Sequence, residues 1–129
     1  SGALDEMLGN QSEDFQKNKF EAGTSKADFT AMLTYRTFEE GGRKTAAKSG
    51  YRPQIKFDFE TMQVSGQQIF IDKIFAFPGD ILEAEITIHS ADYFAGKLKE
   101  GMMFEFREGP TVIGTGKIKQ IMNDKLKAE

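Results

Sequence analysis

The chain has 129 residues, a length that predicts one domain with one core. It contains no cysteine, which excludes disulfides and thiolate metal sites, and no apolar run near the roughly 20 residues needed to cross a bilayer. The net charge of −3 disfavours nonspecific nucleic-acid binding, and no secretory signal pattern is visible, so we expect a cytoplasmic protein.

Residues 1–27 differ from the rest and are predicted to form an N-terminal arm. Leu4, Met7 and Leu8 lie at helical spacing, and Gly9-Asn10 supplies a stop signal. The pattern predicts a short helix followed by a partly helical or flexible stretch, and a poorly ordered leader is the alternative. The apolar residues of this helix can dock on the rest of the chain, on a second copy or in a partner's groove.

From Asp28 onward the hydrophobic period changes to two, which is the spacing of β-strands. Runs with this alternation, separated by glycine- and proline-containing turns, cover residues 28–36, 54–60, 67–71, 80–89, 102–108 and 111–122. The residues expected to face inward include Phe29, Ala31, Leu33 and Tyr35, then Ile55, Phe57 and Phe59, then Leu82, Ala84, Ile86 and Ile88.

One-sided alternation is typical of antiparallel strands with one wet face. We therefore predict an all-β domain over residues 28–122, either a closed barrel or a sandwich of about six strands, followed by a C-terminal tail at 123–129. Gly114 and Gly116 lie inside the last run and predict a sharp bend or a bulge there.

The segment from Arg36 to Lys56 is basic within an acidic chain. It holds six basic and two acidic residues, and this excess of four leaves the remainder at −7 by subtraction. Three interpretations stay open. The segment contacts phosphates, it binds a protein, or it is a solvated loop in which Arg43 folds onto Glu39 or Glu40.

Four sequence pieces then occur in a specific order: EEGGRKT at 39–45, GYRPQ at 50–54, FPGD at 77–80 and FREGPTVIGTG at 106–116. In order and spacing they resemble the C-terminal barrel, domain three, of elongation factor Tu, over roughly residues 28–122. The resemblance implies a six-stranded antiparallel β-barrel. It also implies a surface that contacts the T stem of aminoacyl-tRNA.

The resemblance implies RNA-binding roles for a set of turn and strand residues. The arginine of the Gly-Gly-Arg turn corresponds to Arg43, and the next residue, a histidine in the factor, to Lys44. The other matching positions are Gln54, Ser65, Glu108 and Gly109.

Several positions depart from the family pattern. The lysine expected after the fourth strand falls at Ser90, and the loop from 90 to 101 is longer than the family's, so that Lys97 or Lys99 can substitute. The late turn reads Gly109-Pro110-Thr111 and lacks a second arginine. Thr45-Ala46 replaces Thr-Pro after the first turn.

Catalytic and metal chemistry find little support in the chain. No phosphate-binding loop is present, because GTGKIK at 114–119 lacks both the spacing and the hydroxyl of that motif. His89 is the only histidine, and Ser90 beside it points to the opposite face of a strand. We therefore expect no GTP hydrolysis, no other enzymatic activity, no cofactor and no metal.

Two charged positions have structural interpretations that we prefer. Arg52 precedes a proline and is expected to brace a turn against a carboxylate such as Asp80. Arg107 and Glu108 are expected to form a turn-edge ion pair.

The sequence thus predicts a non-catalytic, translation-factor-like binding module that contacts tRNA or other structured RNA. The alternative is a protein–protein interaction module that engages a GTPase or translation-factor partner without binding RNA. Neither hypothesis involves a membrane or a nucleotide.

Overall fold

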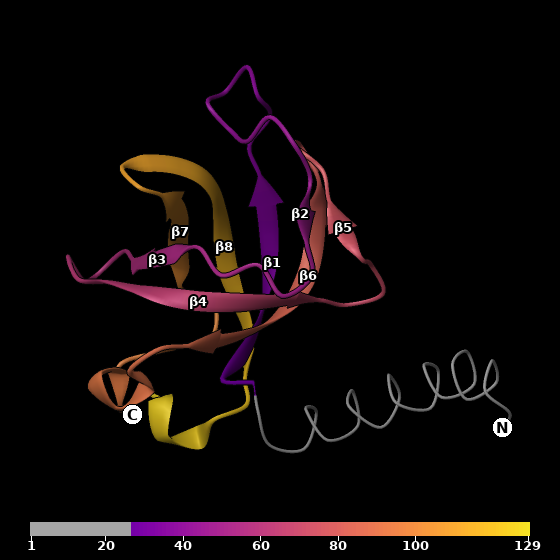
Figure 1. The fold of residues 1–129 in the computed structure, drawn as a ribbon. Helices are drawn as coiled ribbons and strands as arrows, with labels where there is room; N and C mark the ends of the chain where they lie inside the picture. The colour runs from indigo at the N-terminus through magenta and orange to yellow at the C-terminus, as the bar shows by residue number, and fades with distance from the viewer. Residues whose placement is uncertain (1–26) are drawn as a thin grey trace, which may run out of the picture.

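The computed structural model describes residues 27–129, so the predicted N-terminal arm lies outside the described residues apart from Ala27 (Figure 1). Strands and short 3-10 helices follow one another along this part of the chain. In order they are β1 (Phe29–Tyr35), β2 (Ala47–Lys48), β3 (Gln54–Phe57), β4 (Gln63–Phe70), β5 (Phe75–Ala76), β6 (Ile81–Ile88), η2 (Ala91–Phe94), β7 (Met103–Glu108), β8 (Thr111–Ile121) and η3 (Asp124–Leu126).

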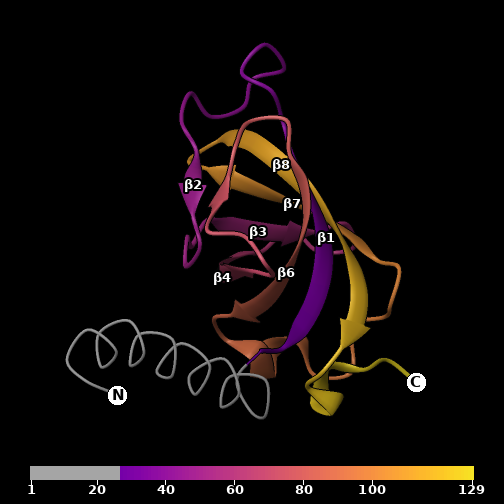
Figure 2. The same cartoon turned by 90° about the vertical axis from the view of Figure 1, so that its right-hand side faces the viewer.

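Six of these strands close into one antiparallel barrel in the order β1-β6-β4-β3-β7-β8. The first strand completes the closure, since Leu33 of β1 lies opposite Leu82 of β6 on one side and Gly116 of β8 on the other. Figure 2 shows β1 and β8 side by side. The predicted six-stranded barrel is confirmed, and the sandwich alternative is wrong.

The two remaining strands, β2 and β5, form a short ribbon outside the barrel ladder. Ala47 lies opposite Ala76, and Lys48 lies opposite Phe75. The sequence did not predict either strand, because two residues are too few to show a period.

Two strand boundaries differ from the prediction by more than the one residue seen at the other strand ends. β3 ends at Phe57, and the carboxylate of Glu60 accepts hydrogen bonds from the next two backbone N–H groups at 3.1 and 3.2 Å, which fixes a turn. Phe59 was expected inside and is instead 45% exposed. β4 begins at Gln63, earlier than the predicted residue 67.

Phenylalanine rings fill the barrel interior. The ring centroid of Phe29 lies 6.1 Å from that of Phe57 and 5.8 Å from that of Phe104, and Tyr35 lies 5.0 Å from Phe106. These tilted and edge-on pairs are the geometry that aromatic quadrupoles prefer. The inward faces predicted for the runs 28–36 and 80–89 are buried in β1 and β6.

Gly114 and Gly116 of β8 leave room for two of these rings. A Cβ atom at Gly116 would lie 2.2 Å from Cζ of Phe104, and one at Gly114 would lie 2.2 Å from Cζ of Phe106. The predicted irregularity is present as a shift in the β7–β8 register between Phe106 and Arg107. Both glycines therefore serve ring packing, and the bulge adjoins the first of them.

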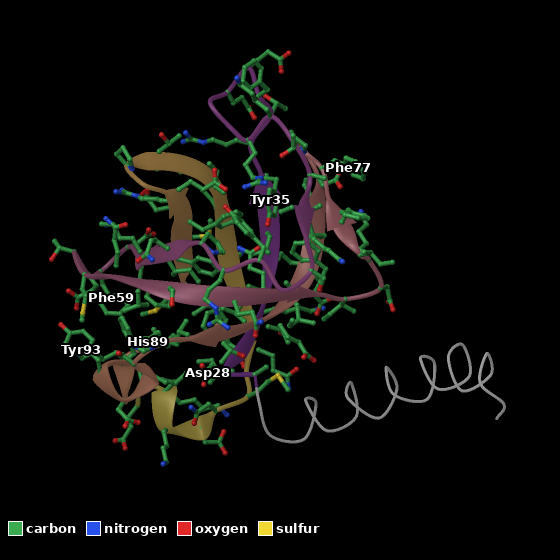
Figure 3. All side chains as sticks on the ribbon, viewed as in Figure 1. Asp28, Tyr35, Phe59, Phe77, His89 and Tyr93 are labelled. Atoms are coloured by element: carbon green, nitrogen blue, oxygen red, sulfur yellow. The ribbon has the colours of Figure 1, made fainter. Side chains whose placement is uncertain are left out.

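Asp28 ties the start of β1 to the strands on either side (Figure 3). Its carboxylate accepts the N–H of Ile88 at 2.8 Å and the side-chain amide of Asn123 at 2.9 Å. Its backbone carbonyl accepts the N–H groups of Met122 and Asn123 at 2.9 and 3.0 Å. These hydrogen bonds of Asp28, which we call the Asp28 latch, join the start of β1 to the ends of β6 and β8.

The predicted tail at 123–129 contains η3, which lies beside η2 (Figure 1). The N–H of Leu98 donates to the carbonyl of Leu126 at 2.8 Å, and the N–H of Ala128 donates to the carbonyl of Leu98 at 2.8 Å. Phe94, Leu98 and Leu126 are buried at this contact. Within residues 27–129 no helix has the length and apolar character needed to cross a bilayer.

Candidate functional site

The segment between β1 and β2 carries the first half of the predicted basic loop and projects beyond one end of the barrel (Figures 1 and 2). The N–H of Thr37 donates to Oε1 of Glu40 at 2.9 Å, and the N–H of Glu40 donates to Oγ1 of Thr37 at 3.1 Å. The N–H of Gly42 donates to the carbonyl of Thr37 at 2.8 Å. A Cβ at Gly42 would lie 2.3 Å from the carbonyl oxygen of Arg36, and Gly41 has a φ of 100°. The Gly-Gly pair is therefore required by the tightness of this turn.

The same contacts affect the ionisation of Glu40, although its side chain is exposed. The backbone N–H of Thr37, and after it the Thr37 side chain, lowers the pKa of Glu40 below its ordinary value of 4.5. The charged form of Glu40 is thus part of the turn.

Arg43 is held firmly by its own turn. Its Nε donates to the carbonyl of Thr45 at 3.2 Å, and its Nη2 donates to Oγ1 of Thr45 at 3.3 Å and to the carbonyl of Ala46 at 3.4 Å. Its Nη1 donates to the hydroxyl of Tyr51 at 3.3 Å and to Oε2 of Glu108. A guanidinium has five N–H donors, so these hydrogen bonds engage all of them.

Glu108 is the acidic partner of Arg43, and the alternative of a local ion pair with Glu39 or Glu40 is wrong. Barrel closure brings the β7–β8 turn against the loop after β1. The local sequence does not reveal this contact, because the two segments are far apart along the chain. The hydroxyl of Tyr51 donates to the same Oε2 of Glu108, and the guanidinium carbon of Arg43 lies 4.9 Å from the Tyr51 ring centroid.

Tyr51 is the residue of this site that the sequence interpretation missed. Its position inside GYRPQ, directly before Arg52, was the available signal. Burial, and next the contact with Glu108, raise the pKa of the Tyr51 hydroxyl, which therefore stays protonated as a donor.

Three other basic side chains of the segment, Lys44, Lys48 and Arg52, are more accessible than Arg43. Lys44 is exposed, with its Nζ 5.9 Å from the ring centroid of Phe38. Lys48 on β2 and Arg52 are exposed, and no ion pair joins either to another described residue. The predicted brace from Arg52 to Asp80 is wrong, because the carboxylate of Asp80 lies 3.9 Å from Nζ of Lys73 instead.

Gln54 and Ser65 lie opposite each other on β3 and β4, and Gln54 also lies opposite Arg107 on β7. Gln54 is exposed and Ser65 is half-buried. The guanidinium of Arg107 donates to Glu105 at 2.8 and 3.0 Å. The expected ion pair between Arg107 and Glu108 is therefore wrong, because Glu108 pairs with Arg43. Among the predicted site residues, the structure thus pairs Arg43 with Glu108 and Gln54 with Ser65.

Gly109 and Lys44 complete the predicted set. Gly109 has a φ of 58° and opens the two-residue turn between β7 and β8. Its role in the structure is conformational, since a left-handed backbone favours glycine. Lys44 lies beside Phe38 on the projecting loop.

A second surface feature was not predicted from the sequence. Four large apolar side chains in and around β5 are strongly exposed: Ile74 at 63%, Phe75 at 45%, Phe77 at 57% and Ile81 at 65%. The rings of Phe75 and Phe77 lie 6.3 Å apart, and Phe77 lies at the outer edge of the molecule (Figure 3). We call these four residues the β5 cluster.

No grouping of three or more histidine, aspartate or glutamate side chains suited to a metal ion occurs among the described residues. His89 is exposed and follows the end of β6, and its backbone N–H donates to the carbonyl of Ser65 at 2.9 Å.

Comparison with known proteins agrees with this geometry. The family model of the elongation factor Tu C-terminal domain matches residues 23–122, most of the chain. The match spans the six barrel strands and both turns that meet at Arg43 and Glu108. The chain therefore belongs to the elongation factor Tu C-terminal domain family.

Proposed function

We propose that this chain is a non-catalytic, translation-factor-like module that contacts structured RNA, tRNA first among the candidates. The proposed contact residues are Lys44 on the loop after β1, Lys48 on β2, Arg52, and the opposed pair Gln54 and Ser65 on β3 and β4. The observation that carries the proposal is the exposure of Lys44, Lys48 and Arg52 on a member of a translation-factor domain family.

The chemistry of the surface suits an A-form helix. Exposed lysines neutralise phosphates, and an amide or hydroxyl on β3 and β4 can hydrogen-bond to a ribose 2′-hydroxyl. Recognition of this kind reads shape rather than sequence. The ion pair with Glu108 of the β7–β8 turn holds Arg43, next to Lys44 in the loop after β1, and Gly109 gives that second turn its left-handed conformation.

The test is binding of purified protein to bulk tRNA at several salt concentrations. We expect Lys44→Ala/Arg52→Ala to weaken binding by roughly tenfold and to flatten the salt slope by about 1 for each cation removed. The matched control is Lys117→Ala/Lys125→Ala, which removes the same charge from exposed positions on β8 and η3.

Either of two results would contradict the proposal. One is the absence of salt-sensitive binding by the wild type at low salt. The other is an equal loss of binding in both double variants, which would indicate unspecific charge attraction.

The β5 cluster supports a second candidate function, a protein-interaction module for a translational GTPase. Four large apolar side chains are exposed between residues 74 and 81, as is typical of a surface that binds another protein. We expect Ile74→Ser/Phe77→Ser to abolish binding to such a partner in calorimetric titration while tRNA binding is retained. Partner binding that both substitutions leave unchanged would exclude the cluster.

A further inference from the structure

We propose that the segment FQKNKF at residues 15–20 docks on an exposed aromatic surface at the end of the barrel where β1 begins. The surface consists of Phe59, Met62 and Tyr93, and we call it the η2 cluster. The inference goes beyond both candidate functions, because it assigns another surface of the protein to a partner within the same chain.

The rings of the η2 cluster are exposed but held in place from below. Phe59 is 45% exposed, Tyr93 43% and Met62 38%. The ring of Phe59 stacks on that of buried Phe57 at 5.8 Å, and the ring of Tyr93 lies 5.0 Å from that of buried Phe94 (Figure 3). Phe57 and Phe94 are themselves 5.1 Å apart. The exposed rings therefore rest on a fixed aromatic base and lose little side-chain freedom when a partner covers them.

Glu60 joins the two segments that form the cluster. The hydroxyl of Tyr93 donates to Oε1 of Glu60 at 3.1 Å, and the backbone N–H of Met62 donates to Oε2 at 3.2 Å. On the η2 side, Nζ of Lys97 lies 4.2 Å from the centroid of the Tyr93 ring. The turn after β3 and η2 therefore present one continuous surface of apolar side chains with charges among them.

The charges of the cluster and of the segment are complementary. Three carboxylates lie in or beside the cluster, those of Asp58, Glu60 and Asp92, against the single ammonium of Lys97, which leaves two negative charges. The segment at 15–20 has two lysines and no acid between two phenylalanines, and the acidic residues next to it lie outside the two rings. Apolar rings with opposite charges beside them match on both sides of the proposed contact.

The position of the chain at the start of β1 favours this surface over the β5 cluster. Asp28 accepts the N–H of Ile88 at 2.8 Å, and η2 begins three residues after Ile88. The β5 cluster lies toward the other end of β1, where Ile81 faces Thr34. Seven residues separate Phe20 from Asp28, and a flexible chain of that length spans about 16 Å on average. The seven residues of β1 extend over roughly 23 Å, so the near end is the one within easy reach.

The experiment uses paramagnetic broadening in the full chain. The sequence has no cysteine, so Ser12→Cys carries a nitroxide label at one defined position. We expect the backbone amides of Phe59, Met62 and Tyr93 in ¹⁵N-labelled protein to lose intensity, and the amides of the β5 cluster to keep theirs. Loss at the β5 cluster in place of the η2 cluster, or no loss at either, would overturn the proposal.

Substitutions on both sides then test the contact. In the spin-labelled chain we expect Phe15→Ser/Phe20→Ser to abolish the broadening, and Phe59→Ser/Tyr93→Ser to abolish it at the remaining amides around the cluster. The first pair lies outside the barrel, so its result does not depend on barrel stability, and the amide spectrum verifies that the second pair folds.

The matched control is Leu4→Ser/Leu8→Ser, which removes two large apolar side chains from the same arm and should leave the broadening unchanged. An equal loss in this control would mean that residues 15–20 are not the docking segment. A mixture of spin-labelled ¹⁴N chain with unlabelled ¹⁵N chain identifies the source of the segment. We expect no broadening in the mixture, and broadening there would assign the contact to a second copy and refute docking within one chain.

Discussion

Single side chains in this protein are fixed by contacts that leave them little freedom. All five N–H donors of the Arg43 guanidinium form hydrogen bonds within the protein. Gly114 and Gly116 must be glycines because phenylalanine rings occupy the space that a Cβ atom would need. At this scale function depends on which side chains remain available. Lys44, Lys48 and Arg52 are exposed, whereas the guanidinium of Arg43 is engaged by its own turn and by Glu108.

Gly116 gives a direct test of the ring packing. We expect Gly116→Ala to destabilise the fold by about 1–3 kcal/mol, because its Cβ would meet the ring of Phe104 against a fixed backbone. The midpoint of urea unfolding measures the change. Combining it with Phe104→Leu should cost less than the two single changes together, and strict additivity would show that the ring and the glycine do not compete for space.

Glu40 gives a test that depends on pH. Its folded pKa lies below 4.5, so its contribution to stability is complete above 4.5 and is lost as the pH falls through the folded pKa. We expect the side-chain ¹³C carboxyl resonance of Glu40 to titrate below 4.5, and Thr37→Val to move the titration part of the way back. A titration at or above 4.5 in the wild type would contradict the hydrogen-bonded turn.

At the scale of elements, barrel strands are joined by polar contacts at their ends as well as by their ladders. Asp28 connects β1 to β6 and to the residues after β8, and η3 packs beside η2. At the other end Arg43 and Glu108 connect the loop after β1 to the β7–β8 turn. Both ends of the barrel are therefore held by residues that lie far apart in the sequence.

Removal of the Asp28 latch should be costly. We expect Asp28→Ala to lower the free energy of unfolding by about 2–4 kcal/mol, because the buried N–H of Ile88 loses its acceptor. Hydrogen exchange at the Ile88 amide should accelerate in the variant. Asn123→Ala leaves the hydrogen bond between Ile88 and Asp28 intact and should lower the free energy of unfolding clearly less than Asp28→Ala does. An equal loss in both variants would mean that the Ile88 hydrogen bond is not the source of the stability.

At the scale of the whole molecule, the basic segment and the β5 cluster adjoin. Lys48 of the basic segment lies opposite Phe75 of the cluster in the β2–β5 ribbon. A large ligand on one surface would therefore reach the other. The two candidate functions then predict competition between RNA and a protein partner rather than independent binding.

Folding of the whole chain should be slow for its size. The barrel closes through pairs such as Leu33 with Gly116 and Ile55 with Phe106, so much of the ladder joins residues distant in sequence. We expect refolding in milliseconds to seconds with a single cooperative transition, measured by stopped-flow fluorescence. Microsecond refolding would mean that local contacts dominate the transition state.

The sequence by itself determined the strand period, the all-β class and the inward faces of β1 and β6, because alternation is a local property that burial enforces at every second residue. The sequence did not predict β2 and β5, which are too short to show a period. Alternation placed Phe59 inside, but the turn made by Glu60 ends the strand and leaves Phe59 exposed. Among the site residues, the opposition of Gln54 and Ser65 follows from strand pairing.

Only the tertiary structure decided that Arg43 binds Glu108 and that Tyr51 joins them, because barrel closure selects which distant turns meet. The exposure of the β5 cluster was decided in the same way, since the ribbon that carries it lies outside the barrel ladder. Local sequence patterns determine which segments form strands, and closure of the barrel determines which side chains stay exposed for binding a partner.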